Sequence, residues 1–67
     1  MNNPQYIRGP GGEVLGRIDE AGDQSYGYDK LGNLVFRYSS FGDMTYDKNG
    51  MAVGRGNMLA ALIFQPQ

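Results

Sequence analysis

YDKLGNLVFR, residues 28–37, is followed 18 residues later by YDKNGMAVGR, residues 46–55. A third and weaker copy, GEVLGR at residues 12–17, aligns with both when the register is set on their glycines. In every copy an arginine lies five residues after that glycine. Copies spaced by 20 and then 18 residues have the period of two short strands plus two turns. The sequence therefore predicts three repeated β-hairpins.

The residues around each repeat glycine are typical of tight turns. Asp29 and Asp47 can open such turns, because an aspartate carboxylate accepts hydrogen bonds from backbone N–H groups further along the turn. Gly32 and Gly50 can end them, because glycine adopts positive φ without a clash. A calcium loop starting at Asp47 is rejected, since methionines stand at its fifth and twelfth positions, where oxygen ligands are needed.

These turns organise the chain as a single domain, residues 1–67, with repeats at about residues 6–22, 23–42 and 43–56. The predicted fold is an all-β meander of three hairpins around a pseudo-symmetry axis, closed or nearly closed. Its strands are expected near residues 5–8, 13–18, 23–28, 33–38, 43–47 and 51–55.

In the strand that follows each repeat glycine, alternate side chains point to opposite faces of the sheet. The pattern of charged and apolar residues predicts which face is the interior. Positions at an even distance from the repeat glycine carry no charge, so we expect these to face inward: Val14, Gly16 and Ile18; Leu34, Phe36 and Tyr38; Ala52, Gly54 and Gly56. We expect the ring of Phe36 to fill space that Gly16 and Gly54 leave open. The odd positions, which include one arginine per copy, are expected to face outward.

The last segment, residues 57–67, departs from the repeat pattern. Its apolar run favours a short helix, with Asn57 as the N-cap and Pro66 as the stop. The alternative is a last strand at residues 62–64. Such a segment must be covered, and we favour a homo-oligomer, a symmetric dimer, with these residues in or beside the interface: Leu59, Leu62, Ile63 and Phe64. Alternatively, the tail caps its own sheet in a monomer.

Composition narrows the possible classes of function. The 67-residue chain has no cysteine and no histidine, so it lacks thiolate ligands, the commonest general base and the commonest neutral metal ligand. We therefore expect no enzyme, no cofactor and no metal site. A formal net charge of −1 argues against nonspecific binding to nucleic acid or anionic membranes. The N-terminus lacks the features of a signal peptide, which makes a cytoplasmic protein, or a domain of a longer chain, the default expectation.

Repeat symmetry singles out one set of charged and aromatic residues as a candidate ligand or partner surface. Two tyrosines lie on the strands that lead into the repeat turns, and we expect each to form a cross-strand pair with a residue of the strand that leaves the turn. With three equivalent arginines they make up the set: Arg17, Arg37, Arg55, Tyr26 and Tyr46. One interpretation is a ring of cations that grips an anion or an acidic partner, with tyrosines stacking on a sugar or nucleobase. The alternative, which we favour, is that each arginine pairs with a turn carboxylate, such as Asp23 or Asp43.

The hairpin motif YDKxGxxVxR resembles the small bacterial proteins called four-fold β-flower proteins, which arrange hairpins as petals around an axis. It is also similar, more weakly, to the YD repeats of large bacterial surface and toxin proteins. Neither resemblance supplies a catalytic residue. We therefore expect a non-enzymatic structural or protein-interaction module of bacterial origin. The alternative is a domain that binds a small ligand, a glycan or an anionic metabolite, through the repeated arginines and tyrosines.

Overall fold

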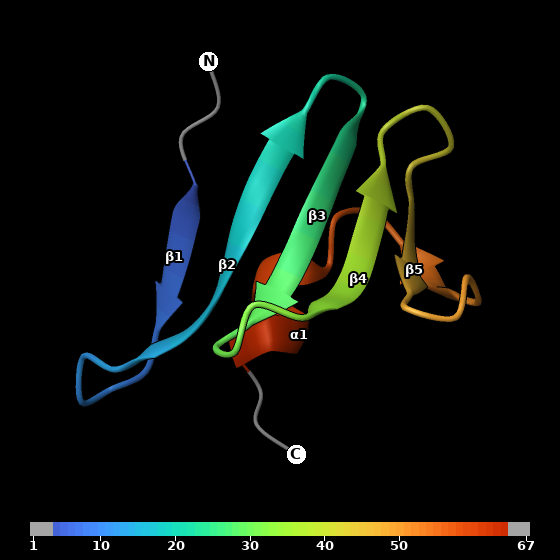
Figure 1. Cartoon of the computed structure of the whole chain (residues 1–67). Helices are drawn as coiled ribbons and strands as arrows, with labels where there is room; N and C mark the ends of the chain where they lie inside the picture. Colours follow the sequence, from blue (N-terminus) through green and yellow to red (C-terminus); the bar gives the residue numbers. More distant parts are fainter. Residues whose placement is uncertain (1–3, 65–67) are drawn as a thin grey trace.

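A computed structural model describes residues 4–64 as one antiparallel sheet with a short helix after it (Figure 1). The six strands pair in chain order, each with the next. The elements are β1 (Gln5–Arg8), β2 (Val14–Ala21), β3 (Gln24–Asp29), β4 (Leu34–Ser39), β5 (Met44–Asp47), β6 (Ala52–Arg55) and α1 (Leu59–Phe64). The prediction of an all-β meander that ends in a short helix is confirmed.

The strands lie close to their predicted positions, and the largest difference is at β2. This strand continues to Ala21, which pairs with Gln24 across a loop of only two residues, Gly22 and Asp23. Gly22 has a φ of 63°, a conformation that glycine reaches without a clash. The turn is therefore shorter than predicted, and β2 extends to Ala21 where the sequence predicted an end near residue 18.

The sheet is open, so the expectation of a closed or nearly closed arrangement is wrong. Within residues 4–64 the strand order runs from β1 to β6 without pairing these two, and the three hairpins lie side by side. The described part of the chain measures 34 × 30 × 18 Å, as expected for one sheet with a helix on one face. In Figure 1 the strands pass in front of α1, which contacts β1, β2, β3 and β4.

The three repeat turns share one backbone geometry. The φ angles of Gly12, Gly32 and Gly50 are 89°, 90° and 86°. In the second turn Asp29 Oδ1 accepts the backbone N–H groups of Leu31 and Asn33, each at 2.9 Å. In the third turn, Asp47 Oδ1 accepts two N–H groups at the equivalent positions, at 2.9 and 3.0 Å. The predicted role of both aspartates is confirmed.

Each hairpin also contains a β-bulge at the same repeat position, which alternation did not predict. The register shifts three residues after each repeat glycine, so that Leu15, Val35 and Val53 have no direct partner in their hairpins. Tyr28 consequently pairs with Leu34, and the two share the face that bears the arginines. The inward assignment of Leu34 is therefore wrong, and Val14 and Ala52 are misplaced in the same way. Beyond the bulges the predicted inward face is correct.

The hydrophobic core forms where α1 packs on the inner face of the sheet. Ile7, Ile18 and Leu59 are buried, with Phe36, Tyr38 and Ile63 packed against them. A Cβ at Gly16 would lie 2.7 Å from Ile63 Cγ2, and one at Gly54 would lie 2.8 Å from Met58 Sδ. The tail, and not the ring of Phe36, therefore fills the space that these glycines leave.

A buried hydroxyl group fastens the start of α1 to the sheet. Thr45 has no exposed surface, and its Oγ1 donates to the carbonyl of Gly56 at 2.6 Å while accepting the N–H of Met58 at 3.1 Å. Asn57 Oδ1 accepts the N–H of Leu59 at 3.1 Å, which confirms the predicted N-cap. The alternative of a strand at residues 62–64 is wrong, and Pro66 lies outside the described residues.

Candidate functional site

The strand register places four of the five tyrosines and all four arginines on the face of the sheet opposite α1. One cross-strand row runs Tyr6, Arg17, Tyr28 from β1 to β3. A second runs Asp19, Tyr26, Arg37, Tyr46 from β2 to β5. With Arg8 and Arg55, which alternation places on the same side, these residues are called the outer face: Tyr6, Arg8, Arg17, Asp19, Tyr26, Tyr28, Arg37, Tyr46 and Arg55.

Arg17 is held in place by two neighbours on the outer face. Its guanidinium carbon lies 4.2 Å from the ring centroid of Tyr28, directly across from it on β3. Its Nε lies 3.2 Å from Asp19 Oδ1, and both side chains of this ion pair keep about a third of their surface exposed. Such a half-exposed pair adds little stability, but together the two contacts fix where the positive charge is presented.

Arg37 repeats this arrangement one hairpin further on. Its guanidinium carbon lies 4.5 Å from the ring centroid of Tyr46, its direct partner on β5. Its Nη1 donates to Gln24 Oε1 at 2.9 Å, and Gln24 Nε2 in turn donates to Ser39 Oγ at 3.3 Å. The arginine is thus oriented by neutral partners, and within residues 4–64 no carboxylate forms an ion pair with it.

Arg55 occupies the third equivalent position but lies on the edge strand β6, where its one strand neighbour in the register is Met44. It is exposed, and among the described residues it forms neither an ion pair nor a stacking contact with a ring. Because β2, β4 and β6 are alternate strands of an open sheet, the three arginines form a row, and the predicted ring is wrong.

The favoured alternative, pairing of the arginines with turn carboxylates, is also wrong in its partners. Arg17 pairs with Asp19, a residue of its own strand. Asp43 instead accepts a hydrogen bond from the Tyr38 hydroxyl at 2.8 Å, and this bond raises the pKa of Tyr38 above its ordinary value. The arginines are therefore held by aromatic rings and strand side chains.

The tyrosine equivalent to Tyr46 is Tyr28 and not Tyr26. Each lies directly across from a repeat arginine, Arg17 or Arg37, and stacks on it. Tyr26 on β3 lies across from Arg37 on β4, and Tyr46 on β5 lies across from Ala52 on β6. The prediction that each tyrosine pairs with the strand leaving its turn is therefore confirmed. The signal for Tyr28 was present in the 18-residue spacing of the two YD motifs.

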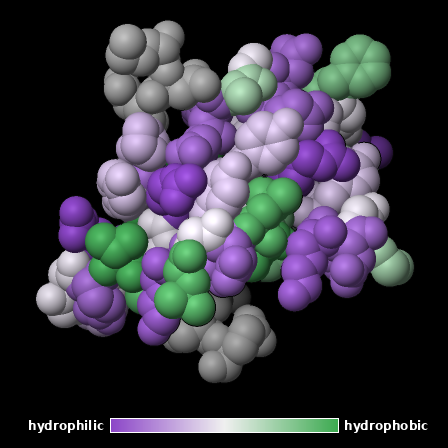
Figure 2. Space-filling model, viewed as in Figure 1, coloured by the Kyte–Doolittle hydropathy of each residue, from purple (hydrophilic) through white to green (hydrophobic). Residues whose placement is uncertain are grey.

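Charge is segregated between the outer face and the turns. All four arginines of the chain lie on the outer face, which carries one carboxylate, Asp19. Asp23, Asp29, Asp43 and Asp47 lie at strand ends and in turns. Figure 2 shows this face with hydrophobic side chains in separate spots among hydrophilic ones. The face is thus locally basic on a chain of net charge −1.

The tail residues predicted for self-association are mostly used within the chain. Leu59 has no exposed surface, and Ile63 contacts the sheet beside Gly16 and Gly27. Leu62 is half-buried, and Phe64 is 50% exposed. The tail therefore covers its own sheet, the alternative considered from the sequence. Self-association stays a prediction, and Leu59 has no surface left to contribute to it.

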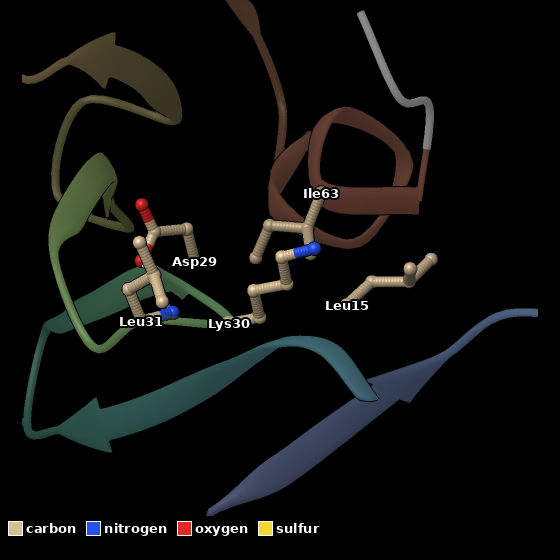
Figure 3. A pocket seen from close by; sticks show the side chains of 5 residues that line it. All are labelled: Leu15, Asp29, Lys30, Leu31 and Ile63. Carbon is tan, nitrogen blue, oxygen red and sulfur yellow. The ribbon is translucent and has the colours of Figure 1, made fainter. Parts of the chain in front are cut away.

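A shallow pocket lies on the helix side of the sheet, between the second repeat turn and α1. Leu15, Asp29, Lys30, Leu31 and Ile63 line it, and Lys30 extends in the direction of Ile63 (Figure 3). Its volume of about 240 Å³ is below the range of roughly 300–1,000 Å³ in which small-molecule sites usually fall. The outer face is therefore the stronger candidate.

Comparison with known proteins identifies no relative: no family model, no curated protein and no solved structure matches the chain. Within residues 4–64, no group of three or more acidic side chains is placed to hold a metal ion. In the same range no helix is long and apolar enough to cross a membrane. What the outer face does must therefore be argued from its own geometry.

Proposed function

We propose that the chain is a non-enzymatic protein-interaction module, and that the outer face contacts acidic side chains of a partner protein. The observation that carries this proposal is the segregation of charge, with four arginines and one carboxylate on the sheet face that α1 leaves uncovered. A locally basic patch attracts a complementary acidic surface and orients it.

The fixed arginines also reduce the cost of binding. Ordering a long side chain at an interface costs about 0.5–1.5 kcal/mol, and Arg17 and Arg37 are already held by Tyr28 and Tyr46. Tyr6 lies across from Arg17 at the end of the row that contains Tyr28, and this residue, which is 53% exposed, offers an aromatic surface to a partner. Tyrosine and arginine are the residue types that contribute most at protein interfaces.

An NMR titration with an octaglutamate peptide tests this proposal. We expect shifts of backbone amides along β2, β3 and β4 that weaken at high salt, and their loss in the double variant Arg17→Gln/Arg37→Gln. The control is Lys30→Gln/Lys48→Gln, which removes the same charge from two turns. Equal losses in both double variants would show that only net charge matters and would overturn the proposal.

A second candidate function, binding of a glycan or an anionic metabolite, is favoured by the stacked arginine–tyrosine pairs. A tyrosine ring can pack on a sugar while the neighbouring guanidinium binds a carboxylate or hydroxyl group. A thermal-shift screen with glucuronate, galactose and inorganic phosphate tests it. A ligand at 100 times its dissociation constant adds about 2.7 kcal/mol to the free energy of unfolding. A shift that persists when Arg17 and Arg37 are replaced by glutamine would contradict this candidate.

A further inference from the structure

One of the three repeat arginines, Arg55, lacks the cross-strand tyrosine that the other two have. Five residues after each repeat glycine stands an arginine, and two of the three have a tyrosine directly across from them on the next strand. Arg17 faces Tyr28, and Arg37 faces Tyr46. Arg55 has no following strand, because β6 is the edge of the sheet and the chain turns away at Gly56, whose φ is 81°.

The backbone of β6 is oriented to accept another strand. The N–H of Gly56 donates to the carbonyl of Asp43 at 2.9 Å, so Gly56 directs its hydrogen-bonding groups toward the β5 side. Because these groups alternate along an antiparallel strand, those of Arg55 point the opposite way, to the open edge. Ala52, Val53 and Arg55 are exposed. Among residues 4–64 nothing pairs with the outward backbone groups of Arg55 or with its guanidinium, so an incoming strand can bind both together.

We propose that the open edge of β6 binds an extended peptide strand of another protein, and that a tyrosine of this strand stacks on Arg55. The pairing would copy the one seen between β2 and β3 and between β4 and β5. In both, an aspartate follows the tyrosine and lies across from the residue before the arginine: Asp29 across from Gly16, and Asp47 across from Phe36. The segment that fits is therefore an antiparallel strand containing Tyr-Asp. This inference rests on the proposed interaction role but uses a different surface.

A second copy of the chain fits this edge poorly. It offers two edge strands, β1 and its own β6. Of these, β1 precedes the first repeat turn as β3 and β5 precede theirs. The residue before that turn is Arg8, where the other two copies have tyrosine. In the shared register Arg8 would lie across from Arg55, and two like charges in direct cross-strand contact are destabilising. The charge of Arg8 therefore disfavours β1 as the occupant, and β6 of a second copy contains no tyrosine to lie across from Arg55. A different strand therefore fits this edge better.

The test is a titration of the ¹⁵N-labelled chain with the capped peptide GDMTYDKN, the chain's own residues 42–49. We expect amide shifts concentrated at residues 52–55. Arg55→Gln, or replacement of the peptide's tyrosine by alanine, should raise the dissociation constant about 2–5-fold, the effect of one exposed cation–π contact. Lys30→Gln, in the turn between β3 and β4, removes the same charge away from both surfaces and is the control that should leave it unchanged. An unchanged dissociation constant in Arg55→Gln, or shifts centred on β1, would overturn the inference.

Two further outcomes separate this inference from its alternatives. If octaglutamate shifts the outer face while GDMTYDKN shifts nothing at β6, the edge inference fails and the proposed function stands. If the unmodified chain alone shows concentration-dependent shifts at residues 52–55, a second copy is the occupant and the inference is wrong. Arg8→Tyr should allow β1 of one copy to pair with β6 of another, and light scattering would show this as a rise in mass. A variant that stays monomeric would show that the charge of Arg8 is not what prevents this pairing.

Discussion

The two faces of the sheet are held by different forces. On the inner face, apolar side chains of α1 pack against Ile7 and Ile18, and Leu59 is fully buried. On the outer face, Arg17 and Arg37 stack on tyrosines and remain partly exposed to water. Burial of apolar surface contributes far more free energy than half-exposed polar contacts. The inner face therefore stabilises the fold, which leaves the residues of the outer face available for binding.

The largest expected effect comes from breaking the inner face at Leu59. Leu59→Ala removes a fully buried side chain, and such changes cost about 2–5 kcal/mol of unfolding free energy. In a chain of this size that is most of the stability. Chemical denaturation followed by circular dichroism measures it, with Ala61→Ser on the exposed side of the same helix as the control. A loss no greater than that of the control would contradict the role assigned to α1.

The second effect concerns the joint between the inner face and the helix. Thr45→Val keeps the shape but leaves the N–H of Met58 and the carbonyl of Gly56 without their partner. Leaving a buried group unpaired costs about 1–3 kcal/mol, and these two groups are partly buried, so we expect a loss near the lower end of that range. Thr45→Ser keeps the hydroxyl and serves as the matched comparison in the same denaturation experiment. A valine variant at least as stable as the serine variant would show that packing, and not hydrogen bonding, holds this joint.

The outer face should respond much more weakly. Arg37→Gln removes one cation–π contact and a hydrogen bond to Gln24, with an expected loss of roughly 0.5–1 kcal/mol. Lys48→Gln, in an exposed turn, controls for the change in charge. A loss as large as that of Leu59→Ala would erase the distinction between the two faces.

The smallest effect is expected in a repeat turn at acid pH. The N–H of Asn33, followed by that of Leu31, holds the pKa of the half-buried Asp29 below its ordinary value of 3.8. A lowered pKa in the fold means that this carboxylate stabilises the fold above pH of about 4 and loses the contribution as the pH falls through its folded pKa. Asp29→Asn should therefore flatten the acid side of a plot of Tm against pH. Asp23→Asn is the control; an equal flattening there would contradict the assignment.

The local parts of the fold were predictable from the sequence, and the parts decided by tertiary contacts were not. Turn residues such as Asp29 and Gly32 act through their own backbone, so their spacing gave the hairpins and the strand positions. The bulges were missed because Val35 has the same apolar character in a bulge as in a regular strand. Closure was wrongly expected because the space left by Gly16 and Gly54 was assigned to Phe36, whereas the tail fills it from one side of an open sheet.

The candidate site was predicted in its residue types but not in its arrangement. The equivalent arginines were found by repeat position, whereas their contacts with Tyr28, Asp19 and Gln24 depend on which residues the register places side by side. The role of Thr45 could not be predicted, because threonine is common in strands. Its hydrogen bonds to Gly56 and Met58 form only once the tail has folded back beside β5.

The joint at Thr45 also determines how many hairpins this chain can carry. The helix begins beside β5, and its six residues extend about 9 Å at a rise of about 1.5 Å per residue, or roughly two strand spacings of about 4.8 Å. The side chains of α1 add to this length, and with them the helix contacts β4, β3, β2 and β1, which are three spacings wide. A fourth hairpin inserted before β5 would move the joint about 10 Å away and leave Ile7 and Ile18 uncovered. The length of the tail helix therefore limits the width of the sheet that it can cover, and this width corresponds to three repeats and not to a longer array.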